Sequence, residues 1–260
     1  MALWICETCG IQHAETPEPP AKCVICEDSR QYVGWQGQRW TTLEELGASH
    51  RADIRDDHGL RGIGCAPSFA IGQRALVVED VLWDCVPLLD GMAEAAGDLR
   101  AIAVSHPHYY TTFVEWSRAF GGIPVHLHAD DREWITRPDP CVQVWEGEEL
   151  DLGDGLTLLR LGGHFVGGQV LHWAAGRALL SGDVVQVVMD RRWVSFMYSY
   201  PNLIPLPAAT VRRMVEKLEP YEFDRVYGAW WGRVVDGDGK ERVRASAERY
   251  LRALQSSPSQ

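Results

Sequence analysis

The sequence is short of positive charge and has no long apolar segment. Its 25 lysines and arginines are outnumbered by 36 aspartates and glutamates, giving a formal net charge of −11. This balance argues against a nucleic acid or an anionic membrane as the main partner. No apolar run reaches the roughly 20 residues of a membrane span. The first ten residues, MALWICETCG, lack the basic and apolar regions of a secretory signal. We therefore expect a cytoplasmic protein.

The 260 residues can form one large domain and a small module. An apolar content of 46% supports a real core, and a charged content of 23% supports a soluble surface. In a cytoplasmic protein, seven cysteines are better explained as metal ligands and buried thiols than as disulfides. Three of them, Cys65, Cys85 and Cys141, are isolated in the sequence, and none has a recognisable nucleophile setting.

Two Cys-x-x-Cys pairs flank the proline-rich segment Pro17–Pro20 near the start of the chain. Four thiolates at this spacing can cage zinc or iron, and a pair of reactive dithiols is the alternative. The stretch resembles the rubredoxin-like module of rubrerythrins. It departs from that pattern at Val24 and Glu27, where the family has proline and glycine, and these departures favour structural zinc over redox iron. The expected ligands are Cys6, Cys9, Cys23 and Cys26.

Between residues 39 and 62 we expect a connector. Thr41 and Glu44 predict a capped helix start, and the charged stretch Arg51–Asp57 favours a solvated loop. Gln31–Val33 is expected as a short strand that closes the four-cysteine module, residues 1–38. Apolar runs such as Phe69–Gly72 are expected to be strands, and helical patterns lie between later runs. Together they predict a layered α/β domain over residues 63–255. Residues 256–260 are expected to be a disordered tail.

One stretch organises this predicted domain. The apolar run Ala101–Val104 reads as a buried strand, and a helical pattern begins near Phe113. Between them lies a loop that carries His106 and His108, with Pro107 stiffening it. Two histidines at this spacing on an extended loop can direct both imidazoles at one metal ion. Taken alone, the pair is a weak indication of a metal site.

Three further residues strengthen the indication of a metal site. His164 lies in a glycine-rich turn, GGHFVGG, Asp183 ends LLSGD, and Asp84 follows a strand in VLWDC. With His106 and His108, this order resembles the metallo-β-lactamase superfamily. The resemblance implies an αββα sandwich and a metal held by the three histidines. It implies that Asp183 completes the shell or positions a water, and that Asp84 orients a ligand histidine.

The departures from that family are equally informative. Tyr110 and Thr111 stand where the family has aspartate and histidine, and Tyr227–Trp231 lacks the final histidine. The missing residues are those that hold a second metal, so the resemblance implies one metal here. His128 is a candidate extra ligand. Tyr110 is a candidate proton donor, and a core-facing aromatic is the alternative.

Aromatic residues gather near the same predicted sheet edge. They favour a pocket for an apolar or aromatic substrate, with an arginine available for an anion. The alternative is that these rings cap the sandwich or form a contact in a homo-oligomer. The candidate pocket residues are Phe165, Arg192, Trp193, Trp230 and Trp231.

The resulting hypothesis is a hydrolase that acts on a small-molecule substrate. One metal ion would activate a water molecule, which would attack an ester, thioester or lactone. Zinc is expected in both sites, and iron stays open for either. Two other functions remain. One is a non-catalytic binding or scaffold protein on a decayed metallo-β-lactamase fold. The other is an iron redox protein, which the missing second-metal ligands disfavour.

Overall fold

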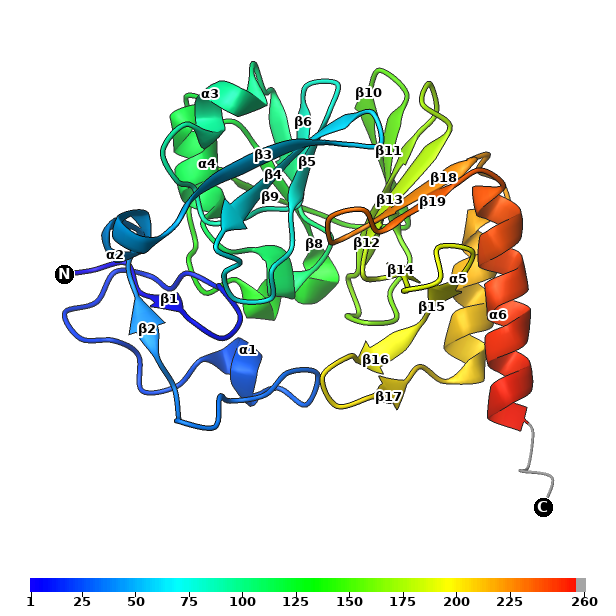
Figure 1. Ribbon diagram of the computed structural model, residues 1–260, viewed down its shortest axis with the longest axis horizontal. Coiled ribbons are helices and arrows are strands. Elements are labelled where there is room, and N and C mark those ends of the chain that lie inside the picture. Colours follow the sequence, from blue (N-terminus) through cyan, green and yellow to red (C-terminus); the bar gives the residue numbers. More distant parts are fainter. Residues whose placement is uncertain (256–260) are drawn as a thin grey trace. The chain divides into compact units, whose positions relative to one another are not determined.

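The computed structural model describes residues 1–255, which form two compact units. Unit 1 comprises Met1–Trp145 and Trp230–Gly232. Unit 2 comprises Glu146–Ala229 and the chain from Arg233 onward. Figure 1 shows the elements of both units in chain order. Within the described residues, every helix is too short or too polar to cross a membrane. The expected tail, residues 256–260, lies outside the described part of the chain.

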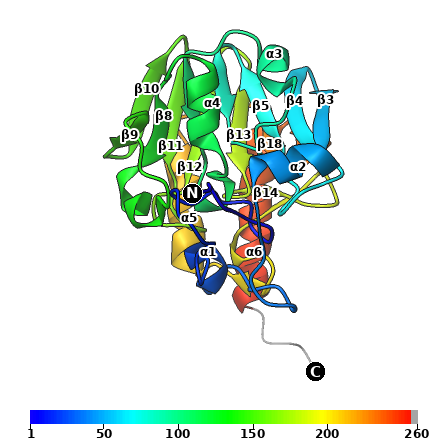
Figure 2. The same ribbon diagram turned by 90° about the vertical axis from the view of Figure 1, so that its left-hand side faces the viewer.

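Unit 1 contains a seven-stranded sheet in the order β3-β4-β5-β6-β7-β8-β9. The strands from β3 to β6 run antiparallel, and those from β6 to β9 run parallel. Helix α3 packs against β3 and β4, and helix α4 packs against β7 (Figure 2). The strands are β3 (Arg51–Asp57), β4 (Leu60–Ala66), β5 (Ala75–Val78), β6 (Val81–Trp83), β7 (Ala101–Ala103), β8 (Val125–His128) and β9 (Val142–Trp145). The helices are α3 (Met92–Ala96), α4 (Phe113–Ala119) and the 3₁₀ turns η1 (Pro107–Tyr109) and η2 (Ala129–Trp134).

The prediction of a solvated loop at Arg51–Asp57 is wrong, because this segment is strand β3. It pairs with β4 along its whole length, and His58 and Gly59 make the turn with positive φ. The exposed charges of Arg51, Arg55 and Asp56 fit a strand at the edge of a sheet, whereas Asp57 is buried against Arg74. The strand expected at Phe69–Gly72 is also wrong. This segment is a turn, closed by a hydrogen bond from the N–H of Gly72 to the Phe69 carbonyl.

The four-cysteine module belongs to unit 1 and contains β1 (Ile5–Cys6) and α1 (Val24–Glu27). The expected connector after it begins with β2 (Trp40–Thr41) and α2 (Leu43–Ser49). Strand β1 pairs with β2 rather than with Gln31–Val33, so the expected strand at Gln31–Val33 is wrong. The capping box at the start of α2 uses Thr42 and Glu45, one residue later than predicted. Ala14 donates its N–H to the Thr136 carbonyl, which ties the module to the segment after η2.

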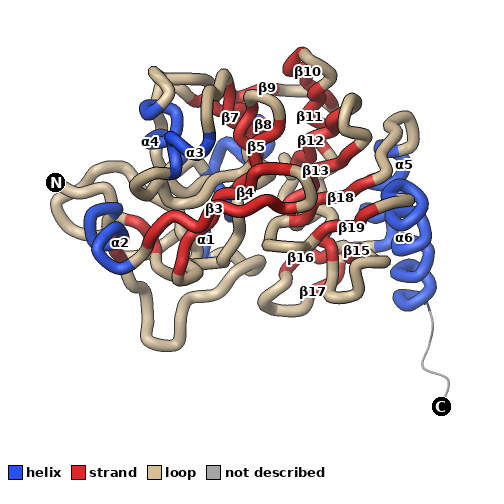
Figure 3. The backbone as a smooth tube through the Cα atoms, turned by 45° about the horizontal axis from the view of Figure 1, so that its top comes forward, coloured by secondary structure: helices blue, strands red, loops and turns tan. Residues whose placement is uncertain are grey.

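Unit 2 contains a six-stranded sheet in the order β10-β11-β12-β13-β18-β19. Helices α5 (Ala208–Leu218) and α6 (Gly239–Gln255) lie side by side (Figure 1 and Figure 3). Their buried faces share one apolar core with the sheet, which includes Val211, Met214 and Val243. The sheet strands are β10 (Glu149–Gly153), β11 (Leu156–Arg160), β12 (Gln169–Trp173), β13 (Ala178–Gly182), β18 (Arg225–Gly228) and β19 (Val234–Asp236). Two short hairpins pair β14 (Gln186–Val187) with β15 (Val194–Ser195) and β16 (Met197–Ser199) with β17 (Ile204–Pro205).

Candidate metal centres

The four-cysteine cluster is formed as the spacing predicts. All four Sγ atoms are buried and lie within 4.8 Å of one another. Cys6 Sγ is 3.5 Å from Cys26 Sγ, and Cys9 Sγ is 3.6 Å from Cys23 Sγ. Hydrogen bonds from Cys26 and Cys6 lower the pKa of the Cys23 thiol, whereas burial raises the pKa of the Cys9 thiol. Four sulfur donors in this arrangement fit a tetrahedral metal ion, either zinc or iron.

Local backbone geometry shapes the first of its two knuckles. The N–H of Gly10 donates to the carbonyl of Cys6 at 2.8 Å, and Gly10 has φ of +82°. A side chain is strained at this φ, which explains the glycine directly after Cys9. Gln38 Nε2 donates to Cys6 Sγ at 3.0 Å, a contact that stabilises negative charge on the sulfur.

The histidine loop of unit 1 is also buried. Strand β7 ends just before it, and His106 and His108 have side chains with their ring centroids 5.1 Å apart. The exposed fractions of the two residues are 1% and 3%. The Oγ of Ser105 lies 2.9 Å from Nδ1 of His106. This contact engages Nδ1, so Nε2 is the ring nitrogen of His106 suited to a metal.

Asp84 supports this loop from the end of β6. Its Oδ1 accepts a hydrogen bond of 2.7 Å from the backbone N–H of Ser105. Burial raises the pKa of Asp84 to about 7, and the bond from Ser105 acts in the opposite direction. Asp84 thus fixes Ser105, and the hydroxyl of Ser105 in turn contacts the ring nitrogen of His106.

Tyr110 and His128 have local roles in unit 1. Tyr110 is 1% exposed, and its ring meets Phe113 edge to face at 5.9 Å. Burial raises the pKa of Tyr110 well above its usual value, so the phenol stays protonated. His128 Nδ1 accepts from the N–H of Asp130 at 3.2 Å and caps η2, and its ring packs on Trp145. Among the described residues, His128 is in no group of three or more clustered metal-ligating side chains.

Unit 2 carries His164 and Asp183. Gly162 and Gly163, with φ of +70° and +87°, lead into His164, whose Nδ1 lies 3.1 Å from the Met197 carbonyl oxygen. Asp183 follows β13 and is buried. Tyr200 lies beside both, because its hydroxyl donates to the Asp183 carbonyl at 2.7 Å and its ring centroid is 5.5 Å from that of His164. Burial raises the pKa of Tyr200, which keeps its hydroxyl a donor.

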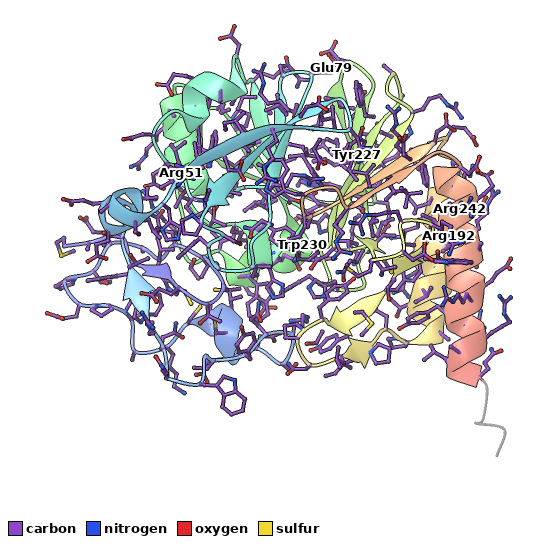
Figure 4. All side chains as sticks on the ribbon, viewed as in Figure 1. Arg51, Glu79, Arg192, Tyr227, Trp230 and Arg242 are labelled. Atoms are coloured by element: carbon purple, nitrogen blue, oxygen red, sulfur yellow. The ribbon has the colours of Figure 1, made fainter. Side chains whose placement is uncertain are left out.

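The predicted pocket residues make separate local contacts in the two units. In unit 2, Phe165 is buried edge-on to His164, and Trp193 lies under Arg249. Arg192 is exposed and forms an ion pair with Asp190. In unit 1, Trp230 Nε1 donates to the Ile71 carbonyl at 3.0 Å. Figure 4 labels Arg192 and Trp230.

Trp231, also in unit 1, lies flat under the Arg55 guanidinium at 4.8 Å. It borders a cavity of about 300 Å³ together with Cys65 and Phe69. Sequence reasoning gave no indication of this arrangement, because Arg55 was expected in a loop. A common wall made of all five predicted pocket residues stays a prediction.

These sheets and their helices define a protein of metallo-β-lactamase fold. The crystal structure of VMB-1 at pH 5.5 superimposes with a TM-score of 0.59 and 13% identity, covering 78% of this chain and 98% of that one. The mono-zinc form of FIM-1 from Pseudomonas aeruginosa gives a TM-score of 0.54 and 14% identity, covering 77% and 96%. At such identities the likeness concerns the fold alone. The predicted fold class, including the N-terminal four-cysteine module, is confirmed.

No family model matches the chain. The chain belongs to the same family as a protein of Bacillus subtilis (strain 168) described as "Uncharacterized protein YmaE". The two are 48% identical over 271 residues, which cover 98% of each chain.

Proposed function

We propose that the chain is a metal-dependent hydrolase in which His106, His108 and His164 hold one metal ion. The metallo-β-lactamase fold supports a hydrolase, and the hydrogen bond at His164 carries the proposal. The Met197 carbonyl can only accept, so Nδ1 of His164 bears the proton and Nε2 keeps its lone pair. Metal-ligating histidines commonly donate their second ring N–H to a carbonyl in this way.

The donor set fits zinc. Neutral imidazoles and a carboxylate are typical ligands of catalytic zinc, and three protein ligands leave a position for water or substrate. His106 is held through Ser105, and His164 through Met197, so two imidazoles are oriented before a metal binds. FIM-1, whose solved structure is a mono-zinc form, supports a single zinc on this fold. Iron accepts the same donors, so metal analysis has to decide the identity of the ion.

A zinc ion held there would supply Lewis acidity for a substrate carbonyl and for water. We assign Asp183 to complete the metal shell or to position a water molecule. Tyr200 fixes the backbone of Asp183. Tyr110 and Thr111 replace the family's aspartate and histidine, so proton delivery to a poor leaving group is weakened. We therefore propose esters, thioesters or lactones as substrates, and a structural metal in the four-cysteine module.

The test compares hydrolysis by the zinc-loaded full chain and by His164→Ala, with p-nitrophenyl acetate, an alkyl thioester and a lactone as substrates. We expect turnover of at least one substrate and a loss of at least about 100-fold in the variant. His172→Ala is the matched control, because His172 is also buried in unit 2 but its Nε2 meets the Glu222 carbonyl. Circular dichroism checks that both variants fold.

Equal rates for wild type and His164→Ala would overturn the proposal. Absence of turnover in a metal-loaded wild type would favour a binding or scaffold protein. A red protein with visible absorbance would indicate iron on the four thiolates.

A further inference from the structure

We infer that unit 2 contains an anion-binding site, in a cavity of about 260 Å³ at the start of helix α5. Arg160 at the end of β11 and Arg213 on α5 both line this cavity, as do Tyr198 and Thr210. The assignment of this site to the substrate rests on the proposed hydrolase function. The inference that an anion binds in this cavity is independent of that function.

The charges around the cavity favour an anion. Among the described residues, the wall contains two arginines and no carboxylate. Glu148, which does not line the cavity, is shared between two cations, because its carboxylate accepts from Arg160 Nη1 at 3.3 Å and from Lys217 Nζ. Arg213, on the exposed side, adds a third cation. Guanidinium groups present a planar set of donors that matches phosphate and carboxylate oxygens.

Neutral donors also line the cavity, beside the apolar side chains of Leu161, Val166 and Leu206. Tyr198 and Thr210 bring hydroxyl groups, which donate to anionic oxygens. Pro207 also lines the cavity and is the N-cap of α5, an 11-residue helix without a side-chain cap. The first turn of such a helix carries partial positive charge and N–H groups directed outward. Here the helix end adds to a pair of arginines rather than acting alone.

The cavity lies next to a proposed metal ligand. Gly162 and Gly163 form part of its wall and directly precede His164. A Cβ on Gly163 would lie 2.8 Å from Sδ of Met214, and its φ of +87° disfavours a side chain, so the turn is held against α5. Because successive Cα atoms are about 3.8 Å apart, the cavity wall begins one residue from the backbone of His164.

This placement assigns a substrate class. A hydrolase substrate would carry a phosphate or carboxylate group a few atoms from its scissile ester, thioester or lactone carbonyl. The arginines would bind that group and so position the carbonyl.

The binding test is calorimetric titration of the full chain with inorganic phosphate and, separately, with acetate. We expect saturable binding, weakened about tenfold or more in Arg213→Gln. Arg212→Gln is the matched control, since Arg212 is exposed on the same helix but does not line the cavity. His164→Ala should retain phosphate binding, which would exclude the metal ion as the binder. Tighter phosphate would indicate a phosphorylated substrate, and tighter acetate a carboxylated one.

Lack of saturable binding by wild type, or equal affinities in wild type and Arg213→Gln, would overturn the inference. A kinetic arm tests the link to catalysis. Arg213→Gln should raise KM about tenfold for the p-nitrophenyl half-ester of a dicarboxylic acid, and the control Arg212→Gln should leave that KM unchanged. If KM for the half-ester is unchanged in Arg213→Gln, the anion site does not bind the charged group of the substrate. If no ester is turned over by wild type, the hydrolase proposal fails, and the phosphate titration still decides the anion site.

Discussion

The carboxylate of Asp84 accepts a hydrogen bond of 2.7 Å from the backbone N–H of Ser105. The hydroxyl of Ser105 in turn lies 2.9 Å from Nδ1 of His106. Asp84 therefore reaches the histidine through its neighbour and acts as a positioning residue for the proposed metal ligand.

The first prediction concerns this link. We expect Asp84→Ala to weaken zinc binding at the histidine site about 10–100-fold, because Ser105 loses its anchor. Asp84→Asn should bind zinc more tightly than Asp84→Ala, since its amide oxygen can still accept from Ser105. Competition with a zinc chelator measures both. The control is Asp80→Ala, which removes a carboxylate that pairs with Arg100 near the surface. An affinity of Asp84→Ala equal to that of wild type would contradict the role.

The second prediction concerns the attachment of the four-cysteine module. Arg137 donates to both Gln12 of the module and Glu115 on α4, and its side chain is 7% exposed. Arg137→Ala leaves Glu115 largely buried without this cation, so we expect a loss of about 3 kcal/mol in the free energy of unfolding. Urea denaturation measures the loss.

The matched control for Arg137 is Arg118→Ala. The Arg118 side chain is 62% exposed and pairs with Asp139, so its removal should cost less than about 1 kcal/mol. Equal losses in the two variants would show that burial of the Arg137 contact has no special weight.

The third prediction concerns the segment Tyr227–Trp231, which lacks the final histidine of the metallo-β-lactamase superfamily. A Cβ on Gly62 would lie 2.4 Å from Cζ3 of Trp231, so only glycine lets this ring lie on β4. We expect Gly62→Ala to destabilise unit 1 by about 1–3 kcal/mol through overpacking. Gly47→Ala, in an open position of α2, should stabilise it by about 0.5–1 kcal/mol. Thermal unfolding of both variants, and of Gly62→Ala with Trp231→Ala, gives the answer. If Gly62→Ala lowers stability as much in the Trp231→Ala background as in wild type, overpacking against the indole is not the cause.

The fourth prediction concerns pH. Burial raises the pKa of Cys65 to about 12, with a smaller contribution from Asp53. The thiolate is the reactive form, so alkylation of Cys65 by iodoacetamide should rise about tenfold per pH unit from pH 7 to 9.5. An unperturbed thiol would approach a plateau by the end of this range. Peptide mapping of the alkylated full chain follows Cys65 alone, and a plateau near pH 9 would contradict the raised pKa.

Much of this fold could be predicted from local patterns. The continuous apolar run Ala101–Ala103 identifies strand β7, and the 3.6-residue periodicity of Val211, Met214 and Leu218 identifies α5. The cysteine cluster was predictable because its two pairs have the spacing that a metal requires. Edge strand β3 was missed because Arg51, Arg55 and Asp56 are exposed and burial does not alternate along the strand.

Other features depend on contacts between distant residues. Nothing local links Asp84 to Ser105, or Gly62 to Trp231, and only the folded chain brings the members of each pair together. Likewise, Arg160 ends a strand and Arg213 lies on a later helix, so their common cavity exists only in the folded unit. Sequence patterns indicate local geometry, and they do not predict which distant residues come into contact.

The measurement that tests the central claim most directly is the metal content of the purified full chain and of His164→Ala. Elemental analysis should find two equivalents of zinc and iron combined in wild type, one for the four cysteines and one for the histidine site. We expect one equivalent in His164→Ala and two in His172→Ala. An unchanged metal content in His164→Ala would contradict a metal ion held by His106, His108 and His164.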